Sequence, residues 1–260
     1  GVGFSKVAEY LTVANVWNGF AESGATLGIT PNMTFTPGPR ALVHFPITGN
    51  VFVAGPFTAA GSEHVNFSTR WDGSAWRRMA STNGGQGDSG FGGNGLDAAA
   101  YAVGISPIGG VFYAAGSFQN VWHGNNSSTA ANRVATWNGT AWSTLTSGPN
   151  DTVLSISFDP SNDRPYFAGA FTTAGGNDRA YIARYNAGTW EPLGANDVNG
   201  TNGTVHAMVW LDGKLYVGGS FSTAYNSNVS NVSTANIAMY DPITNTWSAL
   251  GTGTNDTVFS

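Results

Sequence analysis

The chain has 260 residues, of which 41% are hydrophobic and only 10% are charged, and it contains 36 Gly, no Cys and a formal net charge of −5. The acidic balance and the lack of a basic run exclude a nucleic-acid footprint, and no apolar run is long enough to span a bilayer. Many Gly residues together with 9 Trp, 9 Tyr and 15 Phe favour one large all-β domain of short strands and tight turns over helices or disorder.

A short motif recurs along the chain, in which apolar and aromatic residues surround a Gly. The motif glycines are spaced by 52, 61, 53 and 50 residues, at Gly3, Gly55, Gly116, Gly169 and Gly219. In four of the copies a Phe follows two residues later, at Phe57, Phe118, Phe171 and Phe221. Self-similarity at such a period is the signature of a repeat architecture.

Each full copy is predicted to form four strands. The first strand precedes the motif, at residues 41–45, 100–105, 152–158 and 204–210. The motif is the second strand, at residues 51–57, 112–118, 166–171 and 215–221. The third and fourth strands follow around a turn rich in Asn, Asp and Gly, at residues 70–76, 134–142, 182–190 and 236–250. Residues 17–20 match this last corner in the first, least regular copy.

A four-stranded antiparallel meander is the unit of a β-propeller blade. We therefore predict a single propeller with blade 2 at residues 40–97, blade 3 at 98–150, blade 4 at 151–202 and blade 5 at 203–255. The motif Gly is expected to let the inner strands of neighbouring blades approach closely, and the Phe to fill the space between blades.

Blade 1 is predicted to be composite, with residues 1–39 completed by residues 256–260. The chain begins within a second strand, at Val2-Gly3-Phe4, and ends within a first strand, at Thr257-Val258-Phe259. Pairing of these segments would close a ring of five blades without a free edge. The same pattern is expected of a piece cut from a longer array, and Gly1 in place of Met fits either a processed chain or such a piece.

A family resemblance rests on residues 215–221, 236–240 and 246–251, and on the junctions at residues 150–153, 202–205 and 255–258. These segments resemble kelch-like, galactose-oxidase-type propeller repeats, and they are most similar to those of the fungal cortical cell-polarity marker family. The resemblance covers nearly the whole chain, departs most at residues 1–40 and carries an insertion at residues 119–132. It implies a propeller fold and extracellular display, and it transfers no catalytic residue.

N-glycosylation sequons occur at about twice the number expected by chance from the chain's 25 Asn and 50 Ser plus Thr. Six lie in variable loops, where no turn rule demands them: Asn32, Asn66, Asn125, Asn126, Asn228 and Asn231. Five are weaker candidates, most of them at repeated turns that favour Asn for backbone reasons: Asn138, Asn150, Asn199, Asn202 and Asn255. Their use depends on passage through a eukaryotic secretory pathway.

Catalytic and metal sites are not predicted, and no cofactor is expected. The four His residues are scattered over three repeats, the four Glu residues show no paired spacing for acid–base work, and copper radical chemistry needs a Cys that the chain lacks. Possible ligand contacts are Trp122 and His123 in the loop after Phe118, and Tyr225 at the equivalent place in blade 5. The alternative interpretation of each is that it caps the rim of its blade.

These observations predict an extracellular, N-glycosylated propeller with a structural or adhesive role at a cell surface or in a surface fibre. Its expected partners are other extracellular proteins or further copies of itself, with glycans as a second possibility, and neither nucleic acid nor direct membrane insertion is expected. A carbohydrate-binding propeller is the alternative function, and an enzyme of unknown type is the third.

Overall fold

The computed structural model describes residues 8–11, 16–19, 29–31, 39–45, 47–61, 63–79, 94–123, 127–194, 199–227 and 230–260. These residues form strands and turns, and none of them is helical. Four of the sheets are four-stranded and antiparallel, and each uses its strands in the same order along the chain. They fall within the ranges predicted for blades 2 to 5, and we use those blade numbers below.

Blade 2 contains β4 (Ala41–Phe45), β5 (Asn50–Ala54), β8 (Ser68–Trp71) and β9 (Trp76–Arg77). Blade 3 contains β11 (Ala100–Ile105), β12 (Phe112–Gly116), β15 (Val134–Trp137) and β16 (Trp142–Thr144). Blade 4 contains β17 (Val153–Asp159), β18 (Arg164–Gly169), β21 (Ile182–Asn186) and β22 (Thr189–Glu191). Blade 5 contains β23 (Val205–Leu211), β24 (Lys214–Gly219), β27 (Ile237–Asp241) and β28 (Thr246–Ala249).

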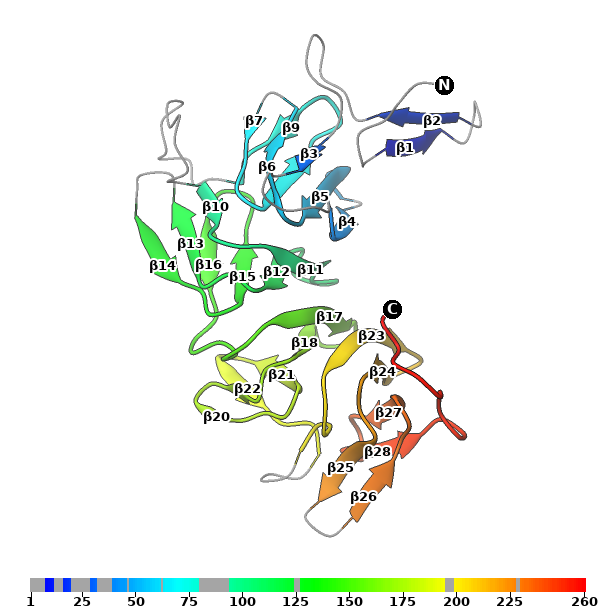
Figure 1. The fold of residues 1–260 in the computed structure, drawn as a ribbon. Helices are drawn as coiled ribbons and strands as arrows, with labels where there is room; N and C mark the ends of the chain where they lie inside the picture. The colour runs from blue at the N-terminus through cyan, green and yellow to red at the C-terminus, as the bar shows by residue number, and fades with distance from the viewer. Residues whose placement is uncertain are drawn as a thin grey trace.

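The blades are arranged as a fan (Figure 1). The first strands β4, β11, β17 and β23 lie side by side near its centre, and the fourth strands lie toward the outside. This radial stacking of antiparallel four-stranded sheets is the β-propeller architecture. The predicted fold class is therefore confirmed, while the count of five blades stays a prediction.

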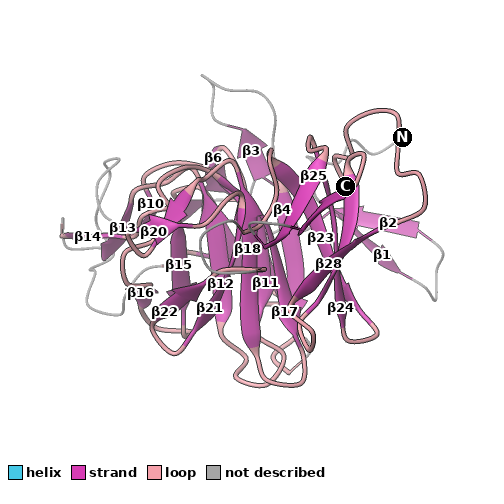
Figure 2. Ribbon diagram, turned by 90° about the horizontal axis from the view of Figure 1, so that it is seen from below, coloured by secondary structure: helices cyan, strands magenta, loops and turns pink. Residues whose placement is uncertain are grey.

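Each blade also carries a two-stranded side hairpin between its second and third strands. The side hairpins are β6 (Phe57–Ala60) with β7 (Glu63–His64), β13 (Asn120–His123) with β14 (Ser128–Ala130), β19 (Thr173–Ala174) with β20 (Asn177–Asp178), and β25 (Thr223–Ser227) with β26 (Ser230–Ser233). The sequence predicts loops at these segments, and the structure shows short paired strands. Figure 2 shows β6, β10, β20 and β25 toward one edge of the sheets, opposite the turns that join β11 to β12 and β17 to β18.

A segment from before each blade adds to its side hairpin. β3 (Ile29–Pro31) pairs with β6, and β10 (Asn94–Leu96) pairs with β13. Single bridges at Pro149–Ala174 and Thr201–Ala224 take the same place in blades 4 and 5. Consecutive blades are thus joined at the side hairpins as well as through their sheets.

The blade junctions also hold the side hairpins through one polar side chain each. Oδ1 of Asn202 accepts hydrogen bonds from the backbone N–H groups of Ser222 and Thr223, at 2.9 and 3.0 Å, and its Nδ2 donates to Oγ of Ser222. Asn150 makes the equivalent bonds to Thr172 and Thr173. Asp97 accepts in the same way from Gln119 and Asn120. Asn150 and Asn202 of the repeated junction therefore have a structural role.

The structural reason why Gly is needed at the motif position differs from the predicted one. A methyl group added at Gly169 would lie 2.1 Å from the carbonyl oxygen of Thr152, at the start of the first strand of the same blade. The same holds at Gly219 with Thr204, also at 2.1 Å. A register shift opens the first strands of blades 3, 4 and 5 at this place, between Val153 and Ser155 in blade 4. The Gly therefore accommodates an irregular strand within its own blade, and the prediction of a contact between blades was wrong.

The core lies between blades, as the motif Phe residues predicted. Phe57, Phe118 and Phe171 are fully buried and Phe221 is 3% exposed. The last three each belong to a cluster that joins two consecutive blades. The prediction that these aromatic rings fill the space between blades is confirmed for them.

A Trp on the fourth strand of blades 3, 4 and 5 also bonds to the preceding blade. The indole Nε1–H of Trp142 donates to the carbonyl of Met79, that of Trp190 to Thr146, and that of Trp247 to Leu193. The distances are 2.5, 2.9 and 3.1 Å respectively. We call these contacts the indole–carbonyl bonds. Each gives a buried N–H its acceptor and fixes the rotation of one sheet against the next.

The predicted corner of the first copy was wrong. β1 (Ala8–Leu11) pairs with β2 (Val16–Gly19), and the register places Asn18 opposite Glu9 and Gly19 opposite Ala8. Asn18-Gly19 therefore lies within a ladder rather than in a turn. An Asn-Gly pair forms a hairpin only where strands on both its sides pair with each other, and here β2 pairs with the segment before it.

The C-terminal segment lies on blade 5. Val258 N–H donates to the carbonyl of Gly219 at 3.2 Å, and the Oγ atoms of Thr257 and Ser220 are 3.1 Å apart. Val258 covers Gly218, where a methyl group would lie 2.5 Å from its side chain. Val205 is the residue equivalent to Val258 in the preceding repeat. It lies in a buried cluster with Ala168 of blade 4, the residue equivalent to Gly218. Val2-Gly3-Phe4, the predicted partner of this segment in the composite blade, lies outside the described residues.

Candidate functional site: a pocket between blades 2 and 3

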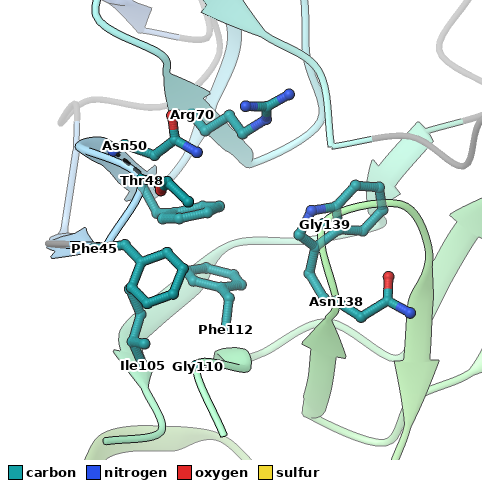
Figure 3. Close-up of a pocket in the computed structure, with 11 residues that line it drawn as sticks. Phe45, Thr48, Asn50, Arg70, Ile105, Gly110, Phe112, Asn138 and Gly139 are labelled. Carbon is teal, nitrogen blue, oxygen red and sulfur yellow. Dashed lines mark hydrogen bonds between the residues drawn. The ribbon is translucent and has the colours of Figure 1, made fainter.

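A pocket of about 250 Å³ lies between blades 2 and 3, on the side of the strand-joining turns (Figure 3). Blade 2 contributes residues of β4, β5, β8 and the turn between β4 and β5. Blade 3 contributes residues of β11, β12, β15 and the turns that follow β11 and β15. The pocket is therefore a product of blade stacking, and neither blade forms it alone.

Aromatic rings form the apolar wall of the pocket. Phe52 and Phe112 stack at a centroid distance of 4.6 Å and an interplanar angle of 24°. Phe45 lies against the turn at Gly110, where a methyl group would come within 2.9 Å of its ring. In Figure 3, Phe45, Ile105 and Phe112 lie on one side of the space and Arg70 on the other. Such a wall suits the face of a flat or ring-shaped ligand.

The polar wall contains two buried N–H donors. Nε of Arg70 and Nε1 of Trp137 are both buried, and neither has a hydrogen-bond acceptor within the described part of the chain. The Trp137 side chain as a whole is only 3% exposed. Because almost all buried N–H groups in proteins are paired, two unpaired donors in one pocket mark a place where an acceptor is expected.

The repeat supplies an internal comparison for Arg70. Arg70 lies opposite Phe52 on the neighbouring strand, as Arg184 of blade 4 lies opposite Tyr166. Arg184 pairs with Glu191 across the next strand, with N–O distances of 2.6 and 2.7 Å. Burial alone would raise the pKa of the Glu191 carboxyl, but hydrogen bonds from Asn186 and Arg184 outweigh it and lower that pKa. Arg184 is thus neutralised by a carboxylate of its own blade.

In blade 2 the residue opposite Arg70 is Arg77 in place of a carboxylate. Arg77 turns to Asp72 instead, with an Nε–Oδ2 distance of 2.6 Å. Burial would raise the pKa of the Asp72 carboxyl, but hydrogen bonds from Arg77, Ala75 and Ser74 hold it well below its usual value. Asp72 therefore bonds within its own turn and does not pair with Arg70. No carboxylate among the described residues balances the positive charge of Arg70.

The predicted ligand contacts do not come together. Trp122 and His123 lie on β13 of blade 3, and Tyr225 lies on β25 of blade 5. All three are half-buried, and Nε2 of His123 is 2.9 Å from Oγ1 of Thr129 on the neighbouring strand. They belong to separate side hairpins, and none of them lines the pocket.

The sequons differ in accessibility. Asn66 is half-buried, and five sequon residues are exposed: Asn138, Asn150, Asn202, Asn231 and Asn255. Asn199 is only 2% exposed, and its amide donates to the carbonyl of Asp178 while accepting from Ala180 N–H. Its side chain is therefore closed to a glycan in the folded chain. Four candidates lie outside the described residues: Asn32, Asn125, Asn126 and Asn228.

Among the described residues, no three His, Asp or Glu side chains gather closely enough to hold a metal ion. No helix in the same residues has the length and apolarity needed to cross a membrane.

The chain is similar to proteins of known fold. The family model of the Rax2 C-terminal beta propeller domain matches residues 135–259. Among solved structures, the structure of U3-55K and the crystal structure of RRP9 WD40 repeats each match with 11% sequence identity and a TM-score of 0.48. The matches cover 87% and 88% of this chain, which spans only 55% of the length of each of those chains. No curated protein sequence is detectably similar.

Proposed function

Since the chain is a β-propeller that resembles the Rax2 family, we propose that it acts outside the cell as an N-glycosylated module with a structural or adhesive role. It works at a cell surface or in a surface fibre, and it acts by binding, not by catalysis. Its partners are other extracellular proteins or further copies of itself.

The side hairpins carry this proposal. The four-stranded sheets repeat closely, but the side hairpins differ in length and sequence from blade to blade, from the two-residue strands of blade 4 to β25 (Thr223–Ser227) of blade 5. All three residues of β14 are exposed. A regular scaffold with irregular surface hairpins suits recognition of one specific partner, because binding residues in proteins gather on loops that a rigid scaffold positions.

The charged groups of the sheets support binding over catalysis. Arg78 pairs with Glu63 at 2.5 Å, and Lys214 pairs with Asp241. Arg184 pairs with Glu191, as described above. These carboxylates are used in ion pairs within one blade, so they serve its stability. The sequons support passage through the secretory pathway, and Asn231 places one of them on an exposed side-hairpin strand.

An exchange of side hairpins tests the adhesive role. Residues 119–132 of blade 3 are replaced by residues 172–180 of blade 4 in the natural full-length protein on its own cells. The two segments start and end at equivalent points, because Arg133 N–H donates to Phe118 and Tyr181 N–H donates to Phe171. Cell attachment is expected to fall severalfold while the surface amount of an epitope-tagged protein and its melting temperature stay the same. Unchanged attachment in this variant and in the same exchange at β25–β26 would refute the adhesive role.

Carbohydrate binding is the second candidate function. It is favoured by Trp122, a half-buried aromatic ring on β13 beside the exposed strand β14. Aromatic rings with polar neighbours suit the apolar face of a sugar ring. A glycan array separates the candidates, because a lectin binds a defined glycan set and a Trp122→Ala variant loses that binding.

A further inference from the structure

We propose that the pocket between blades 2 and 3 binds a small, single-ring carboxylate. The ligand carboxylate accepts hydrogen bonds from Nε of Arg70 and Nε1 of Trp137, and its ring packs against Phe45, Phe52 and Phe112. This site goes beyond the adhesive role and does not rest on it.

The charge of the ligand follows from the comparison of Arg70 with Arg184. Both Arg residues occupy the same position on the third strand of a blade, facing the following blade. Blade 4 supplies the carboxylate of Glu191 to its Arg, whereas blade 2 places Arg77 there and holds it with Asp72. Two Arg residues opposite each other on one sheet face repel, and an anion between the blades relieves that repulsion. The ligand carboxylate therefore takes the place that Glu191 has in blade 4.

A second comparison concerns Trp137. Its counterpart in blade 5 is Tyr240, since each lies opposite the equivalent residue of the second strand, Phe112 or Leu215. The hydroxyl of Tyr240 donates to Oδ1 of Asn245 at 2.6 Å. Nε1 of Trp137 has no such acceptor in the described ranges. The Tyr240 donor of blade 5 thus has an acceptor within its own blade, whereas the Trp137 donor of blade 3 is left for a ligand.

The rest of the lining fits an anion with an apolar ring. The pocket is lined by no Asp or Glu residue, so no carboxylate there repels the ligand. The volume of about 250 Å³ admits one six-membered ring and a carboxylate but not an extended chain. The ring of the ligand can be aromatic or a sugar acid, because both present an apolar face to Phe52 and Phe112.

The test uses the 260-residue chain with ¹⁵N-labelled Trp, whose Trp137 resonance is assigned with a Trp137→Phe variant. Phenylacetate and glucuronate are titrated as the aromatic and sugar probes, with phenylethanol and glucose as matched neutral probes. At least one acid is expected to bind with a Kd of about 1 mM or tighter and to shift the Trp137 indole resonance. The neutral probes are expected not to bind. Failure of both acids to bind overturns the proposal, and comparison of the two acids decides the source of the carboxylate.

Three variants test whether Arg70 binds the carboxylate of the ligand. Arg70→Met introduces the residue type of the equivalent Met239 in blade 5 and is expected to weaken binding about tenfold or more. Arg77→Glu keeps Arg70 but places a carboxylate opposite it, as Glu191 lies opposite Arg184, and is expected to abolish binding by competition. Arg40→Met removes an exposed Arg away from the pocket and is expected to bind as the unmodified chain does.

Binding that survives both Arg70→Met and Arg77→Glu would overturn the assignment of the carboxylate to Arg70. If Arg70→Met does not fold, Arg77→Glu alone decides, because it leaves Arg70 in place. The titration uses isolated protein, and the adhesive role is measured on cells with a different segment exchanged. A negative result in one experiment therefore leaves the other interpretable.

Discussion

The indole Nε1–H of Trp247 donates to the carbonyl of Leu193, 54 residues earlier in the chain, at 3.1 Å, and both groups are buried. The equivalent bonds of Trp142 and Trp190 join blades 2 to 3 and 3 to 4. In each case the acceptor lies just beyond the fourth strand of the preceding blade, so the bond ties together the outer strands of two blades, which are otherwise the farthest from the shared centre.

A Trp247→Phe substitution tests the contribution of this bond. It keeps most of the ring but removes the donor, so the Leu193 carbonyl keeps only its hydrogen bond from Gly200 N–H. The free energy of unfolding is expected to fall by about 0.5–1.5 kcal/mol, measured by urea denaturation. Trp137→Phe is the matched control, because the indole N–H that it removes is buried without an acceptor in the described structure. Equal losses in the two variants would contradict the role of the indole–carbonyl bond.

The motif Gly allows a second prediction. Gly169→Ala places a methyl group 2.1 Å from the carbonyl oxygen of Thr152, a backbone atom that cannot move without shifting the first strand. We expect a loss of about 3 kcal/mol of stability. At Gly109 the atoms nearest to an added methyl group are the side-chain ends of Asp163 and Ser106, at 3.0 Å, so Gly109→Ala is expected to cost less than about 1 kcal/mol. Thermal melting of the two variants side by side measures the difference.

The repeated junction Asn supplies a matched pair. Asn202→Ala removes the three hydrogen bonds to Ser222 and Thr223 and is expected to destabilise the chain by about 1–3 kcal/mol. Its protein should also show faster amide hydrogen exchange in β25 and β26. Asn255 is exposed at the same position of the last junction, and no side-chain hydrogen bond joins it to the described residues, so Asn255→Ala is expected to change stability by less than about 0.5 kcal/mol. A larger effect at Asn255 than at Asn202 would be inconsistent with this role.

Alkaline stability is predicted from Tyr240. Burial raises the pKa of its hydroxyl from 10.0 to about 12. Because the folded pKa lies above the unfolded one, the stability that the neutral hydroxyl contributes is complete below pH 10 and is lost as the pH rises toward 12. Tyr240→Phe loses the hydrogen bond to Asn245 but does not titrate.

The Phe variant is therefore expected to be less stable than the unmodified chain by about 1 kcal/mol at pH 8, and the difference should shrink or reverse by pH 11. Burial also raises the pKa values of Tyr113 and Tyr166, but both residues are present in the two proteins and so affect them equally. A stability difference that stays constant from pH 8 to pH 11 would contradict the assignment.

Much of the fold could be predicted from the sequence because its signals are local. The motif Gly and Phe, and the turns around Trp76, Trp142 and Trp190, mark strands whose partners lie next to them in the chain. The side hairpins gave no such signal. Their strands are two to five residues long and mostly polar, so they show no alternation of apolar and polar residues.

The candidate site could not be predicted in the same way. The pocket depends on one difference between repeats, Arg77 where blade 4 has Glu191, and that difference has meaning only once the cross-strand register is known. The Trp137 donor is equally uninformative in the sequence, since Trp recurs at these corners for packing. Trp122 and Tyr225 were predicted as ligand contacts because they lie in segments that the sequence predicts to be loops. In the structure these segments are side hairpins of two different blades.

The indole–carbonyl bonds also set how the array should respond to load. Each bond joins a blade only to its predecessor, so a pull along the chain is passed from blade to neighbouring blade and is not shared by all the blades at once. One blade can then yield while the next still holds, and each rupture frees a repeat of roughly 50 residues, about 170 Å of extended chain. A protein that anchors cells through such a domain would stretch in discrete steps and absorb work at each one, where a single cooperative core would fail all at once.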